Sequence, residues 1–127
     1  DANTVLSWTN ISYQDWELVK KFLRGPTTII LPVKEGIVHQ SILGKDGTLG
    51  IRIPSHSFGP DLVGRLGFPI TTTSVNKTNQ NPLNNSNDII NEFDGQFDLI
   101  IDDGNLPVSK GSTIYKLEKS KLIVIRK

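Results

Sequence analysis

Residues 25–33 read GPTTIILPV, a short apolar run rich in β-branched side chains and introduced by glycine and proline. A run of this length and composition predicts a strand buried on both faces of a sheet. Residues 49–53 and 69–74 have the same character and predict two more strands. We therefore take a sheet as the framework of the chain.

Helical signals lie on either side of these strands. Residues 12–24 place four apolar side chains on one helical stripe, with Ser12 as the N-cap and the Gly-Pro pair at 25–26 as the stop. These four are Trp16, Val19, Phe22 and Leu23. Residues 57–67 predict a second, short helix that ends at Gly67.

The second half of the chain repeats the alternation of helix and strand. Residues 86–95 predict a helix capped by Ser86, and residues 98–102 predict a strand. Two more strands, at 112–117 and 121–126, are separated by a short turn and predict a hairpin. The fold class that we expect is a mixed α/β sheet with helices packed against it.

The composition is that of an ordinary globular chain. Its 127 residues are 36% hydrophobic and 21% charged, with a net charge of +1, which predicts one domain over residues 1–127 and no general attraction to nucleic acid. Cysteine is absent, which suits the cytoplasm, and no apolar run is long enough to cross a membrane. Because the chain starts at Asp1 and contains no methionine, we expect a fragment of a longer protein.

Small polar side chains gather at residues 71–76, TTTSVN, at the end of a predicted strand. Open α/β sheets bind ligands beyond the carboxyl ends of their strands, so we expect these hydroxyls and Asn76 to form the floor of a nucleotide site. An alternative is that threonine, serine and asparagine simply favour strand ends and turns. The adjoining Asn-rich loop, residues 76–87, is either flexible or ordered by ligand.

Two arginines stand beside apolar runs. Arg52 is flanked by apolar residues, where a guanidinium needs an anion or another partner, and strand periodicity puts Thr48 on the same face. The alternative to a ligand is a structural ion pair. Its candidate partners are Asp61, Asp102 and Asp103. Arg126 ends the last strand, where it binds a ligand or keeps an edge strand soluble.

Other familiar catalytic patterns are missing or ambiguous. His39 and His56 lack carboxylates at metal-binding spacing, so we expect no catalytic metal held by protein side chains alone. The pair Asp102-Asp103 before Gly104 suits an ordinary turn better than acid/base chemistry. The sequence contains no GxxxxGK[ST], GxGxxG or GxSxG motif.

Five short motifs occur in an order that resembles the YrdC/Sua5 family. They are Gly25-Pro26-Thr27-Thr28 followed by IILP, Gly50-Ile51-Arg52-Ile53-Pro54-Ser55-His56, Thr73-Ser74-Val75-Asn76, Ser112-Thr113-Ile114 and Ile125-Arg126. The likeness runs from about Phe22 to Arg126, and its specificity comes from order and spacing. It implies a YrdC-like twisted open mixed sheet flanked by helices, incomplete relative to the family.

The resemblance also implies an activity. Members of the family make threonylcarbamoyl-AMP from L-threonine, bicarbonate and ATP and release pyrophosphate, a nucleotidyl transfer that leads to N6-threonylcarbamoyladenosine in tRNA. By this likeness ATP binds Thr48, Ser74, Asn76, Pro82 and Arg126, and L-threonine binds Arg52, Thr72 and Ser112. Mg²⁺ is expected through the ATP phosphates. Expected partners are tRNA or double-stranded RNA and the proteins that transfer the threonylcarbamoyl group onward.

Two departures from the family pattern leave alternatives open. Val75 stands where the family usually has alanine, and the family's opening Pro-Thr-x-Thr-x-Tyr-Gly-Leu and Lys-x-Arg segments are not found in these residues. One alternative is a catalytically incomplete YrdC-like module that binds nucleotide or RNA. Another is a carbamoyl-transfer domain of hydrogenase maturation, although the cysteine-rich zinc segments expected beside such a domain are missing from this chain.

Overall fold

The computed structural model describes residues 1–107 and 111–127, which divide into two compact units. Unit 1 joins Asp1–Pro69 to Ser112–Lys127, and unit 2 is Ile70–Gly111. Unit 1 contains α1 (Ala2–Trp8), α2 (Tyr13–Phe22), β1 (Thr27–Pro32), the 3-10 turn η1 (Gln40–Ile42), β2 (Thr48–Ile51), α3 (Phe58–Leu66), β3 (Thr113–Glu118) and β4 (Lys121–Arg126). Unit 2 contains α4 (Ser86–Phe93). In the described part of the chain, no helix is long and apolar enough to cross a bilayer.

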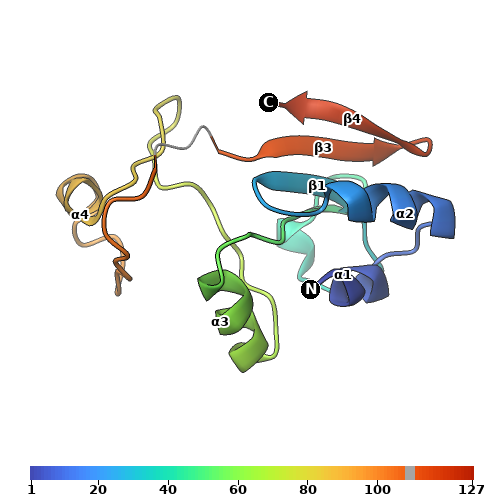
Figure 1. Cartoon of the computed structure of the whole chain (residues 1–127), viewed down its shortest axis with the longest axis horizontal. Coiled ribbons are helices and arrows are strands. Elements are labelled where there is room, and N and C mark those ends of the chain that lie inside the picture. The colour runs from blue at the N-terminus through green and yellow to red at the C-terminus, as the bar shows by residue number, and fades with distance from the viewer. Residues whose placement is uncertain (108–110) are drawn as a thin grey trace. The chain divides into compact units, whose positions relative to one another are not determined.

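The sheet of unit 1 has four strands in the order β2-β1-β3-β4 (Figure 1). β1 pairs antiparallel with β2 and parallel with β3, and β3 pairs antiparallel with β4. The prediction of a mixed α/β sheet with a closing hairpin is therefore confirmed. The parallel pairing of β1 with β3 joins segments far apart in the sequence, with α3 and the whole of unit 2 between them.

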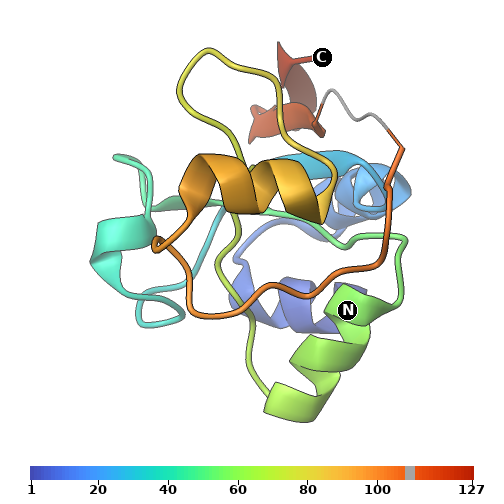
Figure 2. The ribbon, with the colours of Figure 1, turned by 90° about the vertical axis from the view of Figure 1, so that its left-hand side faces the viewer.

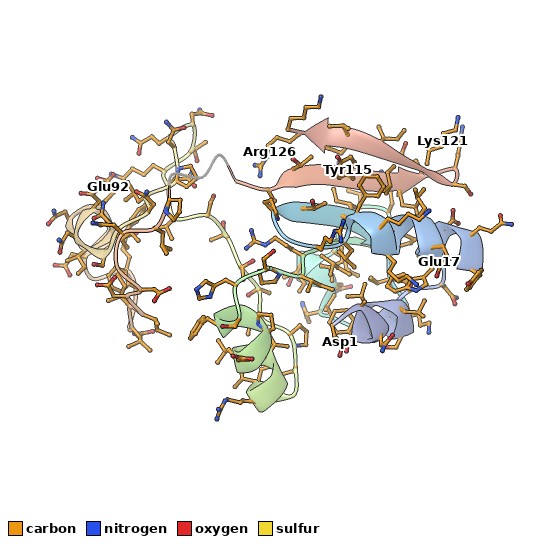
Figure 3. All side chains as sticks on the ribbon, in the orientation of Figure 1. Asp1, Glu17, Glu92, Tyr115, Lys121 and Arg126 are labelled. Carbon is orange, nitrogen blue, oxygen red and sulfur yellow. The ribbon has the colours of Figure 1, made fainter. Side chains whose placement is uncertain are left out.

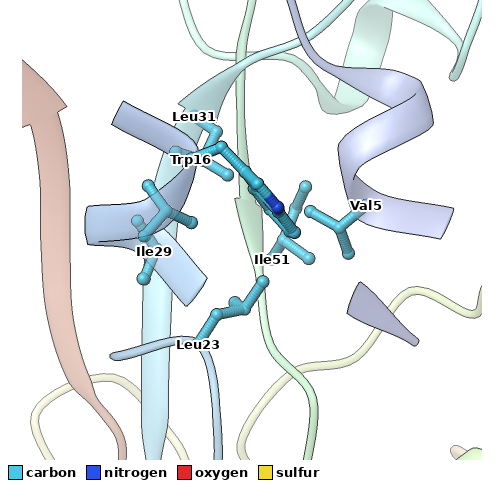
Figure 4. Close-up of a cluster of buried hydrophobic side chains, with 7 residues drawn as sticks. Val5, Trp16, Leu23, Ile29, Leu31 and Ile51 are labelled. Atoms are coloured by element: carbon cyan, nitrogen blue, oxygen red, sulfur yellow. The ribbon is translucent and has the colours of Figure 1, made fainter. Parts of the chain in front are cut away.

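The core lies on one face of this sheet (Figure 4). Ile29 and Leu31 of β1 are fully buried against Trp16 and Val19 of α2, and Val5 of α1 closes the cluster. Burying each large aliphatic side chain stabilises the fold by about 1.5–3 kcal/mol. The prediction that β1 is buried on both faces is wrong, because burial alternates along it and Ile30 is only partly covered. α1 and α2 cover one face, as Figure 1 shows.

Local sequence signals account for several helix ends. Ser12 caps α2 by accepting a hydrogen bond from the Asp15 amide at 3.1 Å. Gly67 ends α3 in the left-handed region, at φ 75. The cap of α4 is a correction: Asn85, not Ser86, accepts from the Asp88 amide, at 2.9 Å. Both residue types cap well, and the helix starts one residue earlier than predicted.

Two predicted strands do not form. Residues 69–74 and 98–102 are irregular, and apolar side chains of the second segment stay exposed, Leu99 by 75% and Ile101 by 60%. Both segments have the composition of strands, but no described strand pairs with them, and a strand needs a neighbour for its backbone N–H and C=O groups.

The structure also contains an N-terminal helix, α1, that was not predicted from the sequence. With seven residues, of which Val5 is buried and Ala2 and Trp8 pack partly against the core, the segment is too short to give a clear helical period. The Asp1 side chain caps it by accepting a hydrogen bond from the Thr4 amide at 2.9 Å. A hydrogen bond from the Lys34 amide to the Trp8 carbonyl, at 2.7 Å, ties its end to the segment after β1.

Within unit 2, hydrogen bonds join the two segments that flank α4. Figure 2 shows the course of the ribbon through these segments. The Asn84 side-chain amide donates to the Leu106 carbonyl at 2.7 Å, and the Leu106 amide donates back to the Asn84 carbonyl at 3.2 Å. The Ser86 hydroxyl donates to Asp102 at 2.9 Å. Polar contacts therefore carry much of the organisation of this unit.

Candidate functional site

Strand register brings three side chains of unit 1 to one edge of the sheet. Ile114 of β3 is the register partner of Thr28 in β1 and of Arg126 in β4. Ser112 lies two residues before Ile114, and Arg126 extends from the end of β4 beside the start of β3 (Figure 3). Ser112 and Arg126, which the family resemblance assigns to different substrates, therefore share this edge.

Hydrogen bonds hold Ser112 in place from several directions. Its hydroxyl lies 2.7 Å from that of Thr28, and its carbonyl accepts from Nη2 of Arg126 at 3.1 Å. The next amide, of Thr113, donates to the Pro26 carbonyl at 2.9 Å. Ser112 is only 9% exposed, so its polar atoms are satisfied mainly by protein groups rather than by solvent.

Arg52 reaches the same edge, because it follows Ile51 of β2, which partners Ile29 of β1. The premise that its guanidinium is hard to solvate is wrong: β2 ends at Ile51, and Arg52 is exposed. Within unit 1 Arg52 forms no ion pair, so pairing with Asp61 does not explain it. Thr28, Arg52, Ser112 and Arg126 lie at the starts of β1 and β3 and the ends of β2 and β4. We call the group formed by these four residues the site edge.

Thr48 lies at the other end of β2. Its register partner is Pro32, the last residue of β1, whereas Ile51 partners Ile29 near the start of that strand. Three residues of strand separate Thr48 from Ile51, which is about 10 Å. The structure therefore does not bring Thr48 to the site edge, and its carbonyl instead accepts from the Gly44 amide at 2.8 Å.

The remaining predicted residues lie in unit 2, where Ser74, Asn76 and Pro82 belong to one loop. The Leu83 amide donates to the Val75 carbonyl at 2.9 Å, which closes the loop and brings Pro82 next to Ser74 and Asn76. Three residues assigned to ATP are thus neighbours. Thr72 precedes this loop and, like Ser74, is exposed.

Asn76 forms two hydrogen bonds within this loop. Its side-chain amide donates to the Lys77 carbonyl at 2.9 Å, and its own backbone amide donates to the Ser74 carbonyl at 3.2 Å. Its side-chain oxygen is buried and has no hydrogen-bond partner among the described residues. An unsatisfied buried acceptor is costly, so this atom is suited to receive a donor from outside the loop.

A separate pocket of about 450 Å³ opens in unit 1 between the end of α2 and the segment after β2. It is lined by Lys21, Phe22, Arg24, Gly25, Pro26, Thr27 and Ser55. Gly25 has φ 61, and a Cβ there would lie 3.1 Å from Oγ of Ser55. Lys21 and Arg24 near the end of α2 give little sequence signal for this pocket, because basic residues at the C-terminal end of a helix are also explained by the helix dipole.

Shifted pKa values lie away from the site edge. Glu118, through its hydrogen bond to Lys116, raises the pKa of Lys116 above the usual 10.5, and Asp46 adds to the effect. Glu17 likewise raises the pKa of Lys20 on α2. Both lysines therefore stay charged at neutral pH. Among the described residues, no three carboxylate, histidine or cysteine side chains are grouped to hold a metal ion.

Comparison with protein families and relatives agrees on one assignment. The model of the Sua5, YciO and YrdC family, described as telomere recombination, matches residues 1–127. A Methanocaldococcus jannaschii protein provisionally named threonylcarbamoyl-AMP synthase is 36% identical over 99% of this chain and 58% of its own length. The threonylcarbamoyl-AMP synthase of Pyrococcus abyssi is 28% identical over 86% of this chain and 32% of its own length.

Solved structures similar to this chain come from the same family. Escherichia coli YciO superimposes with a TM-score of 0.88 and 26% identity, covering 100% of this chain and 62% of that one. Pyrococcus abyssi Sua5 in complex with L-threonine gives a TM-score of 0.82 and 26% identity, covering 98% of this chain and 36% of that one. The chain thus spans less than two thirds of the length of these relatives.

Proposed function

The chain belongs to the Sua5/YciO/YrdC family, and on that premise we propose that the protein makes threonylcarbamoyl-AMP from L-threonine, bicarbonate and ATP. The product would supply the group for N6-threonylcarbamoyladenosine in tRNA. The observation that carries the proposal is the direct contact of Arg126, assigned to ATP, with Ser112, assigned to L-threonine, at 3.1 Å. A reaction that joins two substrates needs their binding groups side by side.

The chemistry follows from the substrates. The amino group of L-threonine and bicarbonate form a carbamate with loss of water. A carbamate oxygen then attacks the α-phosphorus of ATP, the bond to the β-phosphate oxygen breaks, and pyrophosphate leaves. The protein's task in such a step is to position the reactants and to stabilise negative charge, not to supply a nucleophile.

Residues of this chain fit those tasks. Arg126 would face the phosphates with the guanidinium N–H groups that Ser112 does not occupy, and Arg52 is exposed at the same edge to bind a carboxylate or carbamate. Ser74, Asn76 and Pro82 would contribute the loop of unit 2 to ATP, and Thr72 would contribute to L-threonine. Thr48 would take part from the nucleotide side. ATP would enter as its Mg²⁺ complex, with the ion on phosphate oxygens.

We also propose the setting of the reaction. The protein would act in the cytoplasm, and its product would pass to proteins that transfer the threonylcarbamoyl group to tRNA. The absence of cysteine from the chain is compatible with a reducing compartment.

Pyrophosphate release by the full-length protein tests the proposal. Release should require L-threonine, bicarbonate and ATP together. Arg52→Ala and Ser74→Ala should each lower kcat/KM by about tenfold or more, the usual cost of losing a charged or polar substrate contact. Arg65→Ala is a matched control, since Arg65 is an exposed arginine in the last turn of α3. Full activity of both site variants would contradict the assignment of these residues.

A binding module without chemistry is the second candidate. It is favoured by the exposed, oxygen-rich loop of unit 2, which suits a nucleotide whether or not a reaction follows. Binding of ATP with no pyrophosphate release, in the presence of all three substrates, would select this candidate over the synthase.

A further inference from the structure

Thr28 is not among the residues assigned to substrate binding, but its side chain contacts one of them, Ser112. Its Oγ1 lies 2.7 Å from Oγ of Ser112, across a sequence separation of 84 residues. Both residues are at least partly buried. A hydrogen bond of this length between two hydroxyls is well formed, and either oxygen can be the donor.

The rest of Ser112 is already constrained. Its carbonyl is bonded to Arg126, and the amide of the following residue, Thr113, is bonded to Pro26. The freedom that remains lies in the side-chain rotamer and in the direction of the hydroxyl hydrogen. Thr28 acts on that remaining freedom, because each hydroxyl has a single hydrogen to donate and the pair must share one.

We propose that Thr28 is a positioning residue, whose hydroxyl orients the Ser112 hydroxyl toward bound L-threonine. The inference rests on the proposed function, in which Ser112 contacts that substrate. With Thr28 in place, the Ser112 oxygen presents a fixed lone pair or hydrogen to the ligand. Without it, the hydroxyl would have to be ordered at the moment of binding, at a cost in affinity.

The neighbouring threonine supplies the control. Thr27 alternates with Thr28 along β1, so it lies on the face of Ile29 and Leu31, and it lines the pocket at the end of α2. Valine has nearly the shape of threonine, lacks the hydroxyl and favours strands. Thr28→Val and Thr27→Val therefore make the same chemical change on opposite faces of one strand.

Calorimetric titration of the full-length protein with L-threonine tests the inference. Thr28→Val should weaken binding by about fivefold to tenfold, the range expected for one lost hydrogen bond. Thr27→Val should bind within about twofold of the unchanged protein. Thr28→Ser, which keeps the hydroxyl, should restore most of the affinity, whereas a merely structural role for the threonine methyl group would leave it impaired.

A double-mutant cycle identifies the route of the effect. If Thr28 acts through Ser112, then Thr28→Val should cost little once Ser112→Ala is present. Equal losses in both backgrounds would overturn the positioning role. Unchanged binding by Thr28→Val would also overturn it and leave the proposed function standing, while failure of the unchanged protein to bind L-threonine would overturn both.

Discussion

At the residue scale, Gly64 inside α3 and Gly67 at its C-terminal end make opposite demands on the backbone. Gly67 ends the helix at φ 75, whereas Gly64 lies inside it, and a Cβ at either position would meet no atom within 4 Å. Any difference between alanine substitutions at these sites must therefore come from backbone conformation alone. Left-handed φ costs a residue with a Cβ about 1–2 kcal/mol, and helical glycine costs about 1 kcal/mol relative to alanine.

We predict that Gly67→Ala lowers the free energy of unfolding by about 1 kcal/mol and that Gly64→Ala raises it by about 0.5–1 kcal/mol. Denaturant unfolding followed by circular dichroism measures both changes. Two shifts of the same sign would contradict the assignment of Gly67 as the left-handed cap of α3.

The site edge shows how far single residues could be predicted. The order of motifs pointed to Arg52, Ser112 and Arg126, and the structure places all three at one end of the sheet. The partner of Ser112 could not be predicted, because the contact with Thr28 depends on the register of a parallel pair whose strands are far apart in the sequence. The exposure of Arg52 was missed for a local reason, since β2 ends one residue before it.

At the scale of elements, the turn between β3 and β4 is built from unfavourable residues. Lys119 and Ser120 have φ 46 and φ 60, the pair of positive values typical of a type I′ hairpin turn. Neither lysine nor serine prefers this region, whereas Asn-Gly does. The turn therefore stores strain that a substitution can remove.

Lys119→Asn combined with Ser120→Gly should raise the free energy of unfolding by roughly 1 kcal/mol, because the αL penalty at both positions is reduced. The thermal unfolding midpoint, measured by calorimetry, should rise with it. Lys121→Asn, one residue further on and inside β4, is the control and should not stabilise, since asparagine disfavours strands. A lower midpoint for the double variant would argue against a type I′ turn.

Elements were predictable where the signal is local. Helix α2, the end of α3 and the β3–β4 hairpin depend on short windows of sequence and are confirmed, but Phe22, placed on the apolar stripe of α2, is 40% exposed. Residues 69–74 and 98–102 have the composition of strands, but a strand forms only when another strand pairs with it, and a short window of sequence does not contain that partner. α1 was missed because a helix of seven residues is too short to give a clear apolar period.

At the scale of the whole molecule, burial is uneven between the units. Every fully buried hydrophobic side chain among the described residues belongs to unit 1, and none of the described residues of unit 2 is classed as buried. Local stability follows buried apolar contacts and protected hydrogen bonds. The two units should therefore differ in how readily they open.

Native-state hydrogen exchange measured by mass spectrometry should show this difference. Amides of β1 and β3 should exchange only through global unfolding, whereas residues 70–107 should exchange with much lower protection. Ile29→Ala, which empties a fully buried position, should lower protection in β1 and leave residues 70–107 nearly unchanged. Equal protection in both units would contradict the inferred imbalance. The expectation of one domain over residues 1–127 stays a prediction.

The parallel pairing of β1 with β3 has a consequence for how the chain folds. The β3–β4 hairpin and α2 need only local closure and should form early, while β1 can meet β3 only after a long segment has looped back, so this step should limit the folding rate. Loop-closure entropy grows only logarithmically, by about 0.6 kcal/mol for each doubling of the loop. Homologues are therefore free to lengthen or shorten the segment of unit 2 at little thermodynamic cost, provided that the two strands still meet in register.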